Sequence, residues 1–491
     1  MARAVVIGAG IGGLAAAIRL AAGGHRVTLV EAQPDLGGRA RQLRDGGFTW
    51  DMGPTIVTAP HLLDALWRAA GRRLSDDLDL TPLQPFYEIR FRDGRRFAYG
   101  GPGMLDEIAR FDAGDVVGYR RFMADTGAMY RRAFESLGRQ PFGQLGTFLG
   151  VVPELVRIGG LSSVYAYVSR YFRNEHLRTV FSFHPLFIGG NPFRASAFYA
   201  IVPYLESQGG VLFARGGTHA LVRAMARLLE SLGGQIRAGA PVAEILARDG
   251  RAAGVRTTRG DDLPADIVVS NADPAATWRM LPGRPRFRSY RYSMSCFVLY
   301  LGLRGICPEL RHHTVLMPRD YSGVVQDVFR GRLREDDLAL YVHAPTRTDR
   351  SLAPPGCESL YALVPVPNLN GEPDWPAVGD RLREHVLGLL RDELGIADVE
   401  RRIAVEHRFT PIEFRDQLNS ERGAAFSIEP TLLQSAYLRP HNKPALLPGL
   451  YLVGAGTHPG AGIPGVLMSA EIAASLIGPA AEVAHPAVAV P

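Results

Sequence analysis

Two glycine-rich loops at opposite ends of the chain contain the residues best suited to chemistry. The first, from Gly8 to Gly13, has the G-x-G-x-x-G spacing that lets a backbone approach a pyrophosphate closely. The second, from Gly454 to Gly465, contains five glycines and two prolines. Loops of this kind present backbone N–H groups to a flat or anionic ligand without side chains in the way. Together the two loops predict one extended cofactor that is held by both ends of the chain.

The elements around the first loop are those that a dinucleotide site needs. Residues 4–7 form an apolar run typical of a buried strand, and residues 14–22 have a helical pattern. A second predicted strand, residues 26–30, is followed by Glu31, 23 residues after Gly8, where a carboxylate can accept ribose hydroxyls. An ordinary strand–turn–helix unit would not explain all these pieces, so the pattern predicts dinucleotide binding.

The remaining loops favour FAD over NAD as the dinucleotide. Gly37-Gly38-Arg39 and Gly53-Pro54-Thr55 are further small-residue turns that can run along a longer cofactor toward an isoalloxazine ring. The C-terminal loop would place a helix N-terminus at the pyrimidine side of the flavin, where its partial positive charge stabilises reduced flavin. The predicted cofactor-binding residues are Gly8, Gly10, Gly12, Gly13, Glu31, Ala32, Gly38, Arg39, Gly53, Pro54, Thr55, Val242, Gly454, Ala455, Gly456, Gly465 and Val466.

The composition limits the class of protein. The chain has 491 residues, of which 21% are charged and 46% hydrophobic, and this predicts a globular protein of two domains. Its formal charge of +6 fits attraction to an anionic membrane and fits an ordinary basic protein equally well. Because the arginines are scattered and no recognition motif is present, we expect no nucleic-acid partner.

The cysteines and the apolar runs bear on location and on metals. Cys296, Cys307 and Cys357 lack metal-ligand spacing, so we expect reduced thiols and no metal-ligand cluster in the chain. No signal peptide precedes the first strand, and no apolar run approaches the ~20 residues that cross a bilayer. We therefore expect a cytoplasmic protein that does not cross a membrane, with peripheral association at the inner face of the membrane left open.

The predicted elements divide the chain into five segments and a tail. The segments with the pattern of an FAD-binding domain are residues 1–75, 205–275 and 400–478. The segments of the predicted substrate domain are residues 76–204 and 276–399. We expect residues 479–491 to be a disordered tail. The fold class is α/β: a Rossmann-type FAD-binding domain with an inserted mixed α+β substrate domain.

Further motifs extend the pattern over nearly the whole chain. They are VIGAGIGGLAAAIRL and GFTWDMGPTIVT near the start, SFHPLFIGGNPF and VVSNADP in the middle, and FRDQLNS, AFSIEPTLLQSAYLRPHN and LVGAGTHPGAGIPGV near the end. In these motifs the chain resembles the bacterial-type phytoene desaturases, which are FAD-dependent carotenoid desaturases. The resemblance implies a fold of the amine-oxidase-like flavoprotein class, a long apolar tunnel, and peripheral attachment to the membrane that dissolves the carotenoid substrate.

The resemblance also implies the reaction. Phytoene would lose a hydride from an allylic CH2 to flavin N5 and a proton from the adjacent carbon, and each round would add one double bond toward neurosporene or lycopene. Oxygen or a quinone would then reoxidise the flavin. Such chemistry depends on orientation and a dry pocket, and aromatic faces can stabilise an allylic cation. The candidates for that lining, each of which fits plain core packing equally well, are Phe181, Phe183, Phe187, Phe193 and Tyr199.

The proton acceptor is the least defined part of the implied site. His458 lies within the C-terminal glycine loop, and Glu429 and Asp416 lie in neighbouring motifs. Each is a candidate catalytic residue, and each could instead hold the loop through hydrogen bonds.

Two positions depart from the related families. Gly454-Ala455-Gly456 stands where related amine oxidases often have an acidic residue that holds the ribityl chain. Gly150 stands where phytoene desaturases tend to have arginine or lysine, so a mechanism that depends on that cation is in doubt here. Residues 150–172 mix apolar and aromatic side chains with spaced arginines, and we favour a membrane-facing surface over an interior helix for them.

Other functions remain open on the same scaffold. The first is a desaturase, isomerase or oxidase of a later carotenoid, such as a hydroxylated one. A more distant alternative is a non-catalytic escort of prenyl lipids, but such escorts have degraded flavin motifs. Gly8, Gly10, Gly13 and Glu31 are intact in this chain, which favours an enzyme.

Overall fold

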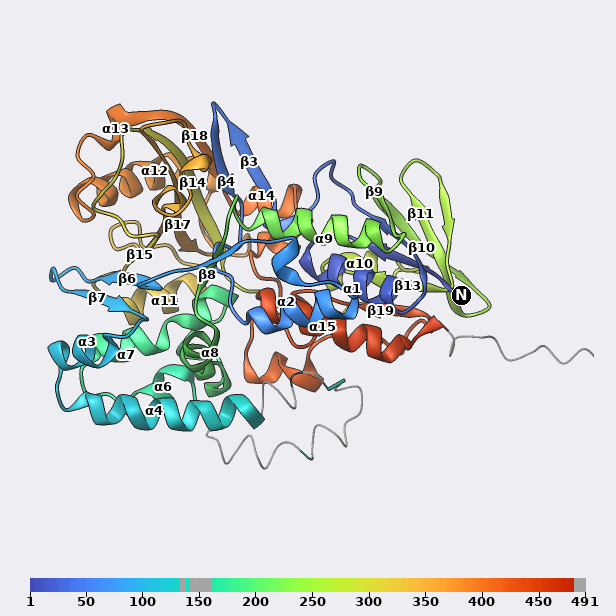
Figure 1. The fold of residues 1–491 in the computed structure, drawn as a ribbon, viewed down its shortest axis with the longest axis horizontal. Coiled ribbons are helices and arrows are strands. Elements are labelled where there is room, and N and C mark those ends of the chain that lie inside the picture. The colour runs from blue at the N-terminus through green and yellow to red at the C-terminus, as the bar shows by residue number, and fades with distance from the viewer. Residues whose placement is uncertain (133–137, 139, 142–149, 151–159, 481–491) are drawn as a thin grey trace, which may run out of the picture.

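The computed structural model describes residues 1–132, 138, 140–141, 150 and 160–480. These residues form two lobes (Figure 1). One, drawn at the right with the N-terminus, contains the segments predicted to bind a nucleotide and is called the nucleotide-binding lobe. The other contains the segments predicted to bind substrate and is called the substrate lobe; in it a large sheet lies above a layer of helices. The expected disorder after residue 480 and the part of the expected membrane-facing segment at residues 151–159 lie outside the described residues.

A five-stranded parallel sheet forms the centre of the nucleotide-binding lobe. Its strand order is β19-β13-β1-β2-β9, and every pair of neighbours is parallel. The strands come from early, middle and late parts of the chain, and the strands predicted at residues 4–7 and 26–30 are confirmed. They are β1 (Arg3–Ile7), β2 (Arg26–Val30), β9 (Gln235–Arg237), β13 (Ile267–Ser270) and β19 (Leu450–Leu452).

Strand β1 lies at the centre of this sheet because both of its faces are apolar. Ala4 and Val6 pack against helices, whereas Val5 and Ile7 pack against a small antiparallel sheet. A parallel strand covered on both faces has a continuous apolar sequence, which explains its clear signal. The helices are α1 (Ile11–Ala22), α9 (His219–Ser231) and α15 (Ile463–Ile477), and the antiparallel strands are β10 (Val242–Arg248), β11 (Arg251–Thr257) and β12 (Asp262–Pro264). Helices α1 and α15 lie side by side (Figure 1) although they come from opposite ends of the chain.

A seven-stranded sheet dominates the substrate lobe. Its order is β18-β14-β17-β16-β15-β6-β7, and all neighbours are antiparallel except β15 and β6. Helix α12 (Trp375–Asp392) packs on one face, and Pro376 is tolerated because it lies in the first turn. The strands are β6 (Tyr87–Arg90), β7 (Arg96–Tyr99), β14 (Ser295–Arg304), β15 (His313–Leu316), β16 (Leu340–His343), β17 (Cys357–Val366) and β18 (Ile403–Phe409).

The helical layer of the substrate lobe has an aromatic core. Phe172 stacks on Phe181, with ring centroids 4.6 Å apart, and both are buried. Val164 and Tyr167 are also buried, so the expected membrane-facing surface is wrong for these two residues: their side chains fill the interior. The helices are α3 (Met104–Phe111), α4 (Asp115–Met129), α6 (Val164–Val168), α7 (Glu175–Ser182), α8 (Val202–Gly209) and α11 (Tyr321–Phe329), with 3-10 turns η4 (His184–Ile188) and η5 (Ala197–Ile201).

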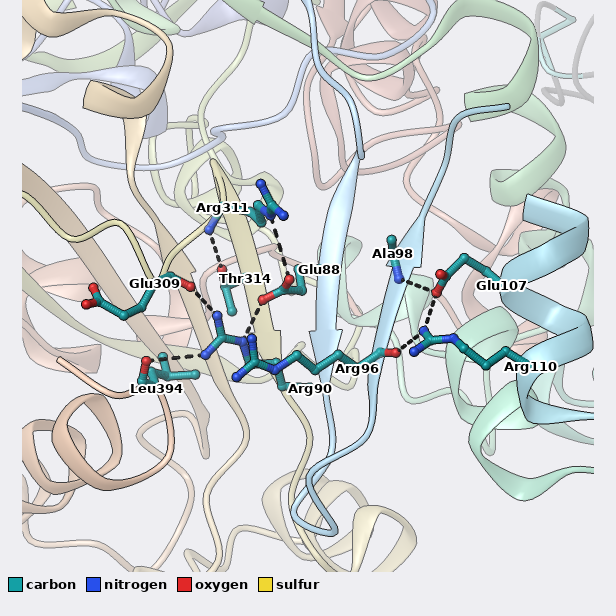
Figure 2. A network of polar contacts seen from close by, with 10 residues as sticks. All are labelled: Glu88, Arg90, Arg96, Ala98, Glu107, Arg110, Glu309, Arg311, Thr314 and Leu394. Atoms are coloured by element: carbon teal, nitrogen blue, oxygen red, sulfur yellow. Dashed lines mark hydrogen bonds and ion pairs between the residues drawn. The ribbon is translucent and has the colours of Figure 1, made fainter. Parts of the chain in front are cut away.

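A network of charged side chains holds β6 against β15 at the edge of the large sheet (Figure 2). Arg90 is buried and donates hydrogen bonds to the Glu88 carboxylate at 2.6 Å, to the Leu394 carbonyl at 3.3 Å and to the Glu309 carbonyl. Arg311 lies 3.7 Å from the same Glu88 carboxylate. Since Glu309 and Arg311 immediately precede β15, the network fixes the strand that carries His313.

The remaining elements complete the two lobes. The helices are α2 (Pro60–Ala69), α10 (Pro274–Arg279), α13 (Val399–Arg402) and α14 (Pro411–Asp416). The strand pairs are β3 (Gln42–Asp45) with β4 (Phe48–Asp51), and β5 (Leu80–Pro82) with β8 (Leu212–Ala214). Among the helices of the described residues, none combines the length and the apolar character that crossing a bilayer requires.

Candidate active site

The two glycine loops predicted to share a cofactor lie against each other. A Cβ atom added at Gly12 would lie 3.2 Å from Cα of Gly454 and 3.3 Å from Cβ of Val466. Asn271 lies between the loops: its Oδ1 would be 2.7 Å from a Cβ at Gly12 and 2.5 Å from one at Gly454. Side chains at either glycine would therefore fill the space where the loops meet.

Asn271 is a site residue that the sequence analysis did not assign. It follows β13 directly, and β13 is the neighbour of β1 in the parallel sheet. The carboxyl ends of parallel strands meet at one edge, where ligands bind in α/β sheets. The sequence signal for this role was the position of Asn271 directly after the apolar run that forms β13.

The first loop ends at the N-terminus of α1, where Gly10 supplies no side-chain cap hydrogen bond. Gly8 has φ +92°, a left-handed conformation that glycine adopts without strain. A Cβ atom at Gly13 would overlap the Gly8 carbonyl oxygen, so only glycine lets the helix pack this closely on the turn. The resulting helix N-terminus attracts phosphate through its free N–H groups and its dipole.

Glu31 braces the same loop. Its Oε2 accepts a hydrogen bond from the Ala9 N–H at 2.7 Å, and its Oε1 accepts one from the Gln33 N–H at 2.9 Å. A carboxylate has about four lone-pair sites, so acceptors remain for a ribose, and this role stays a prediction. Of the other predicted contacts on this side, Ala32 is exposed, and Val242 packs against the core below Glu31.

The second and third predicted loops continue from the first. Gly37 N–H donates to the Ala9 carbonyl at 3.0 Å, and a Cβ at Gly38 would lie 3.5 Å from Cα of Gly10. Arg39 then crosses to the C-terminal part of the chain, where its guanidinium donates to the Ala425 carbonyl at 2.6 Å and to the Ser420 hydroxyl at 2.8 Å.

Gly53 packs directly on Arg39, because a Cβ at Gly53 would overlap the Arg39 carbonyl oxygen. Pro54 is half-buried and Thr55 is buried after it. These loops therefore follow one another in a row from the helix N-terminus toward the substrate lobe.

The C-terminal loop is held by buried polar side chains. Arg439 is 1% exposed and donates to the Ala455 carbonyl at 2.7 Å and to the Ile428 carbonyl at 3.1 Å. Burial lowers the pKa of Arg439. The Asn442 amide donates to the His458 carbonyl at 3.1 Å. These bonds fix the loop before α15 begins at Ile463, and Gly465 and Val466 lie in the first turn of that helix.

The assembled loops fit a flavin dinucleotide. They offer a helix N-terminus without a side-chain cap, a cradle of glycine loops that pack directly on each other and on Asn271, and a buried hydroxyl on Thr457 that lacks a hydrogen-bond partner among the described residues. A buried hydroxyl without a partner is costly and is explained by a ligand that pairs with it.

The three proposed proton acceptors are not brought together. Asp416 is exposed and pairs with Arg415 at 2.6 Å. Glu429 is 1% exposed and lies 3.0 Å from Arg194, and burial raises its pKa while the arginine opposes that shift. His458 is buried, which lowers its pKa to about 3, with a further contribution from the nearby Arg439 cation.

The proposed aromatic lining is divided between fully buried and half-buried side chains. Phe181 and Phe183 are 1% and 2% exposed and belong to the aromatic core. Phe187 is half-buried, with its ring centroid 6.3 Å from that of Tyr341. Phe193 is half-buried beside Tyr165, with ring centroids 4.7 Å apart. Tyr199 is half-buried, and burial raises its pKa.

Two buried polar groups in the substrate lobe were not predicted. Tyr87 donates to the Glu206 carboxylate at 2.6 Å, and His184 lies 3.4 Å from the same carboxylate. The second group consists of buried histidines whose ring nitrogens lie within 4.8 Å of one another, namely His312, His313 and His343. The pairing of β15 with β16 brings together histidines that are 30 positions apart in sequence, and the expectation that the chain holds no metal site stays a prediction.

Comparisons with known proteins agree with this site. A family model described as flavin containing amine oxidoreductase matches residues 11–478. The chain is 45% identical to a phytoene desaturase (neurosporene-forming) of Rhodobacter capsulatus, over 100% of this chain and 96% of the relative. It is 43% identical to a phytoene desaturase (lycopene-forming) of Pseudescherichia vulneris, over 97% and 99%. A crystallised oxidoreductase from Methanosarcina mazei matches 97% of this chain and 99% of its own, with TM-score 0.67 and 18% identity.

The fold and the glycine cradle define a flavin-dependent oxidoreductase of the amine-oxidase-like class. The fold class expected from the sequence is thereby confirmed. Within that class, the chain belongs to the flavin containing amine oxidoreductase family and to its branch of bacterial-type phytoene desaturases. The resemblance found in the motifs is confirmed over the full length of the chain.

Proposed function

We propose that the protein is an FAD-dependent phytoene desaturase that adds successive double bonds to phytoene toward neurosporene or lycopene. The observation that carries this proposal is the full-length similarity to two relatives named for those products. FAD is favoured among flavins because a dinucleotide fingerprint and Glu31 precede the other loops. Bound in the cradle, FAD would supply the hydride acceptor.

The residues of the chain would bind, orient and exclude water. The N–H groups at the start of α1 would hold the pyrophosphate, and Glu31 would accept ribose hydroxyls. Arg439 would keep the C-terminal loop in place through the Ala455 carbonyl. Phe187 and Tyr341 would orient the polyene from the substrate lobe, since their rings lie beside each other.

The proposal extends to partners and location. Phytoene is dissolved in lipid, and this supports peripheral attachment at the inner face of the membrane from a cytoplasmic protein. The net charge of +6 supports attraction to anionic lipid. Oxygen or a quinone would receive the electrons after each round.

The test is product analysis in cells engineered to accumulate phytoene. We expect extracts to contain products with lengthened conjugation, and the absorption bands then count the steps between neurosporene and lycopene. Unchanged phytoene beside folded, flavin-loaded protein would overturn the proposal and favour a later carotenoid as substrate. A purified protein without a flavin spectrum would favour the escort alternative.

A further inference from the structure

A line of buried polar side chains begins at the third flavin loop. Oγ1 of Thr55 lies 2.5 Å from the Tyr341 hydroxyl, which lies 2.8 Å from Nδ1 of His313. Thr55 is 5% exposed and His313 is 1% exposed. Tyr341 and His313 come from the adjacent strands β16 and β15, so the contact depends on the register of the sheet.

The line continues through the other two histidines toward the surface. His343 is directly opposite His313 in the register, and its Nε2 lies 3.1 Å from Nε2 of His312. One ring nitrogen of each histidine lies within 4.8 Å of the others, a gap that one water molecule can bridge because two hydrogen bonds span about 6 Å. Nδ1 of His312 lies 2.6 Å from the hydroxyl of Thr348, which is half-buried.

The inner end of this line lies where the flavin loops meet the aromatic lining. Phe187 packs on Tyr341, and the next residue, Ile188, lies 3.4 Å from the Cβ position of Gly462 in the C-terminal loop. Thr55 belongs to the loop that packs on Arg39. The Tyr341 hydroxyl therefore lies beside the third flavin loop, and its ring lies beside the predicted aromatic lining.

The line is uncharged. Burial lowers the pKa of His312 to about 3 and lowers the pKa values of His313 and His343 well below the usual range. Burial raises the pKa of the Tyr341 phenol, with the Asp51 charge adding to the shift. A neutral imidazole has one N–H and one lone pair, which is the arrangement that accepts a proton on one side and releases one on the other.

We propose that Tyr341, His313, His343 and His312 form a relay that carries the proton of desaturation from the flavin-facing pocket to Thr348 and solvent. This inference rests on the proposed desaturase function. The C–H bond next to the carbon that has lost hydride breaks, and its electron pair becomes the new double bond. The proton bonds to the Tyr341 oxygen while the phenolic proton passes to Nδ1 of His313.

The remaining steps return every group to its starting charge. His313 releases the proton on Nε2 across the gap to the His343–His312 pair, and His312 passes a proton from Nδ1 to Thr348 and solvent. Nε2 of His313 has no hydrogen-bond partner among the described residues, as a nitrogen that faces a bridging water would have. One proton leaves for each double bond, the charge of the relay is unchanged, and rotation of the groups or proton exchange through water restores the starting tautomers before the next round.

The two acidic candidates, Glu429 and Asp416, are less suited to accept the proton of desaturation. Glu429 is paired with Arg194 at 3.0 Å and lies 3.9 Å from Arg291, and Asp416 is exposed beside Arg415. Both are already paired with cations. The relay instead joins a neutral acceptor at the pocket to an exit through neighbouring strands.

The first test compares Tyr341→Phe with Tyr361→Phe in vesicles that contain phytoene. Tyr361 is a buried tyrosine on β17 whose ring centroid is 6.1 Å from that of Tyr341, and within the described parts of the chain it makes no hydrogen bond to the histidines. We expect Tyr341→Phe to slow desaturation roughly 10²-fold and to change the solvent deuterium isotope effect. Tyr361→Phe should keep both values, and both variants should keep the flavin spectrum and the Tm of the wild type.

A second readout needs neither substrate nor turnover. In protein with 15N-labelled histidine, the nitrogen resonances of His313 should shift in Tyr341→Phe and stay unchanged in Tyr361→Phe. His313→Gln tests the next step and should reproduce the kinetic defect. Unshifted resonances in Tyr341→Phe would overturn the relay.

The outcomes separate the relay from the proposed function. Wild-type protein that leaves phytoene unchanged overturns the desaturase proposal and the relay with it. Wild-type protein that desaturates phytoene, beside a Tyr341→Phe variant with full rate and an unchanged isotope effect, overturns the relay alone. About one divalent metal ion per purified chain, lost in His343→Asn, would also overturn it, because the cluster would then be a metal site.

Discussion

The two lobes differ in what forms their candidate sites: backbone atoms in one lobe and side chains in the other. In the nucleotide-binding lobe the candidate site is mostly backbone: glycine loops at the carboxyl ends of parallel strands that pack directly on one another. In the substrate lobe the candidate site is made of side chains, such as Tyr341 and His313, that project from neighbouring strands of a mixed sheet. A backbone site requires particular residues at fixed local spacing, whereas a side-chain site requires only that distant strands pair in one register.

This difference predicts unequal tolerance to substitution. Where backbone atoms touch, a single methyl group displaces the loop. Where side chains meet through hydrogen bonds, a conservative change removes one interaction and leaves the packing. Substitutions in the nucleotide-binding lobe should therefore have the largest effects.

The largest effect is expected for Gly13→Ala. The added methyl group would overlap the Gly8 carbonyl oxygen, and relief requires a shift of the helix or of the turn. Overpacking of this kind costs roughly 3 kcal/mol, and we expect flavin content to fall more than about tenfold. The flavin-to-protein absorbance ratio of the purified variant measures the flavin content.

The matched control is Gly103→Ala at the start of α3. A Cβ atom there meets no other atom within 4 Å, and φ is −87°. It should keep full flavin content. A Gly13→Ala protein with full flavin content would remove the contrast between the lobes.

The nucleotide-binding lobe was predictable because its constraints are local. The apolar run of β1 and the glycines after it predicted the strand, the turn and α1 from one short segment. The C-terminal loop was predictable for the same reason, and α15 begins two residues before Gly465. In both places the residue type is dictated by atoms a few positions away.

The substrate lobe was predicted less completely because its contacts are distant in sequence. His313 and His343 have no characteristic spacing, and only the pairing of β15 with β16 makes them neighbours. Asn271 was missed because its role depends on two loops that are more than 400 residues apart. Val164 and Tyr167 were misplaced because an amphipathic pattern does not distinguish a membrane from a protein core.

A smaller effect is expected for Glu31→Gln. The substitution keeps the shape of the side chain, and its amide oxygen can still accept from the Ala9 N–H, but it removes the charge that would accept the ribose hydroxyls. Hydrogen bonds to charged groups contribute about 1.5–3 kcal/mol, so flavin affinity should fall about 10- to 100-fold. Flavin titration of the protein freed of cofactor measures the change.

The control for that titration is Glu230→Gln, an exposed residue at the C-terminal end of α9 in the same lobe. It should bind flavin as the wild type does. Equal affinity in Glu31→Gln and the control would mean that the carboxylate only braces the loop and makes no contact with the cofactor.

The smallest effect is expected for the pH dependence of stability in His312→Gln. The buried histidine has a pKa of about 3 in the folded protein, whereas its ordinary value is 6.5. Between these values the unfolded chain binds more protons than the folded one, so the free energy of unfolding decreases as pH falls. One such histidine changes the free energy of unfolding by up to about 1.4 kcal/mol per pH unit. In His312→Gln the free energy of unfolding should therefore depend less steeply on pH, by most of that amount.

Urea unfolding at pH 6 and pH 5 measures that slope in the wild type, in His312→Gln and in His385→Gln, an exposed residue on α12. The His385 variant should retain the wild-type slope, while His312→Gln should be flatter. The groups that face His312 are His313, His343, Thr348 and the ring of Phe213, none of them charged, so the slope reports burial of the imidazole rather than an ion pair. Equal slopes in all three proteins would mean that water reaches His312 in solution. The group of three histidines would then be as accessible to solvent as the protein surface beside it.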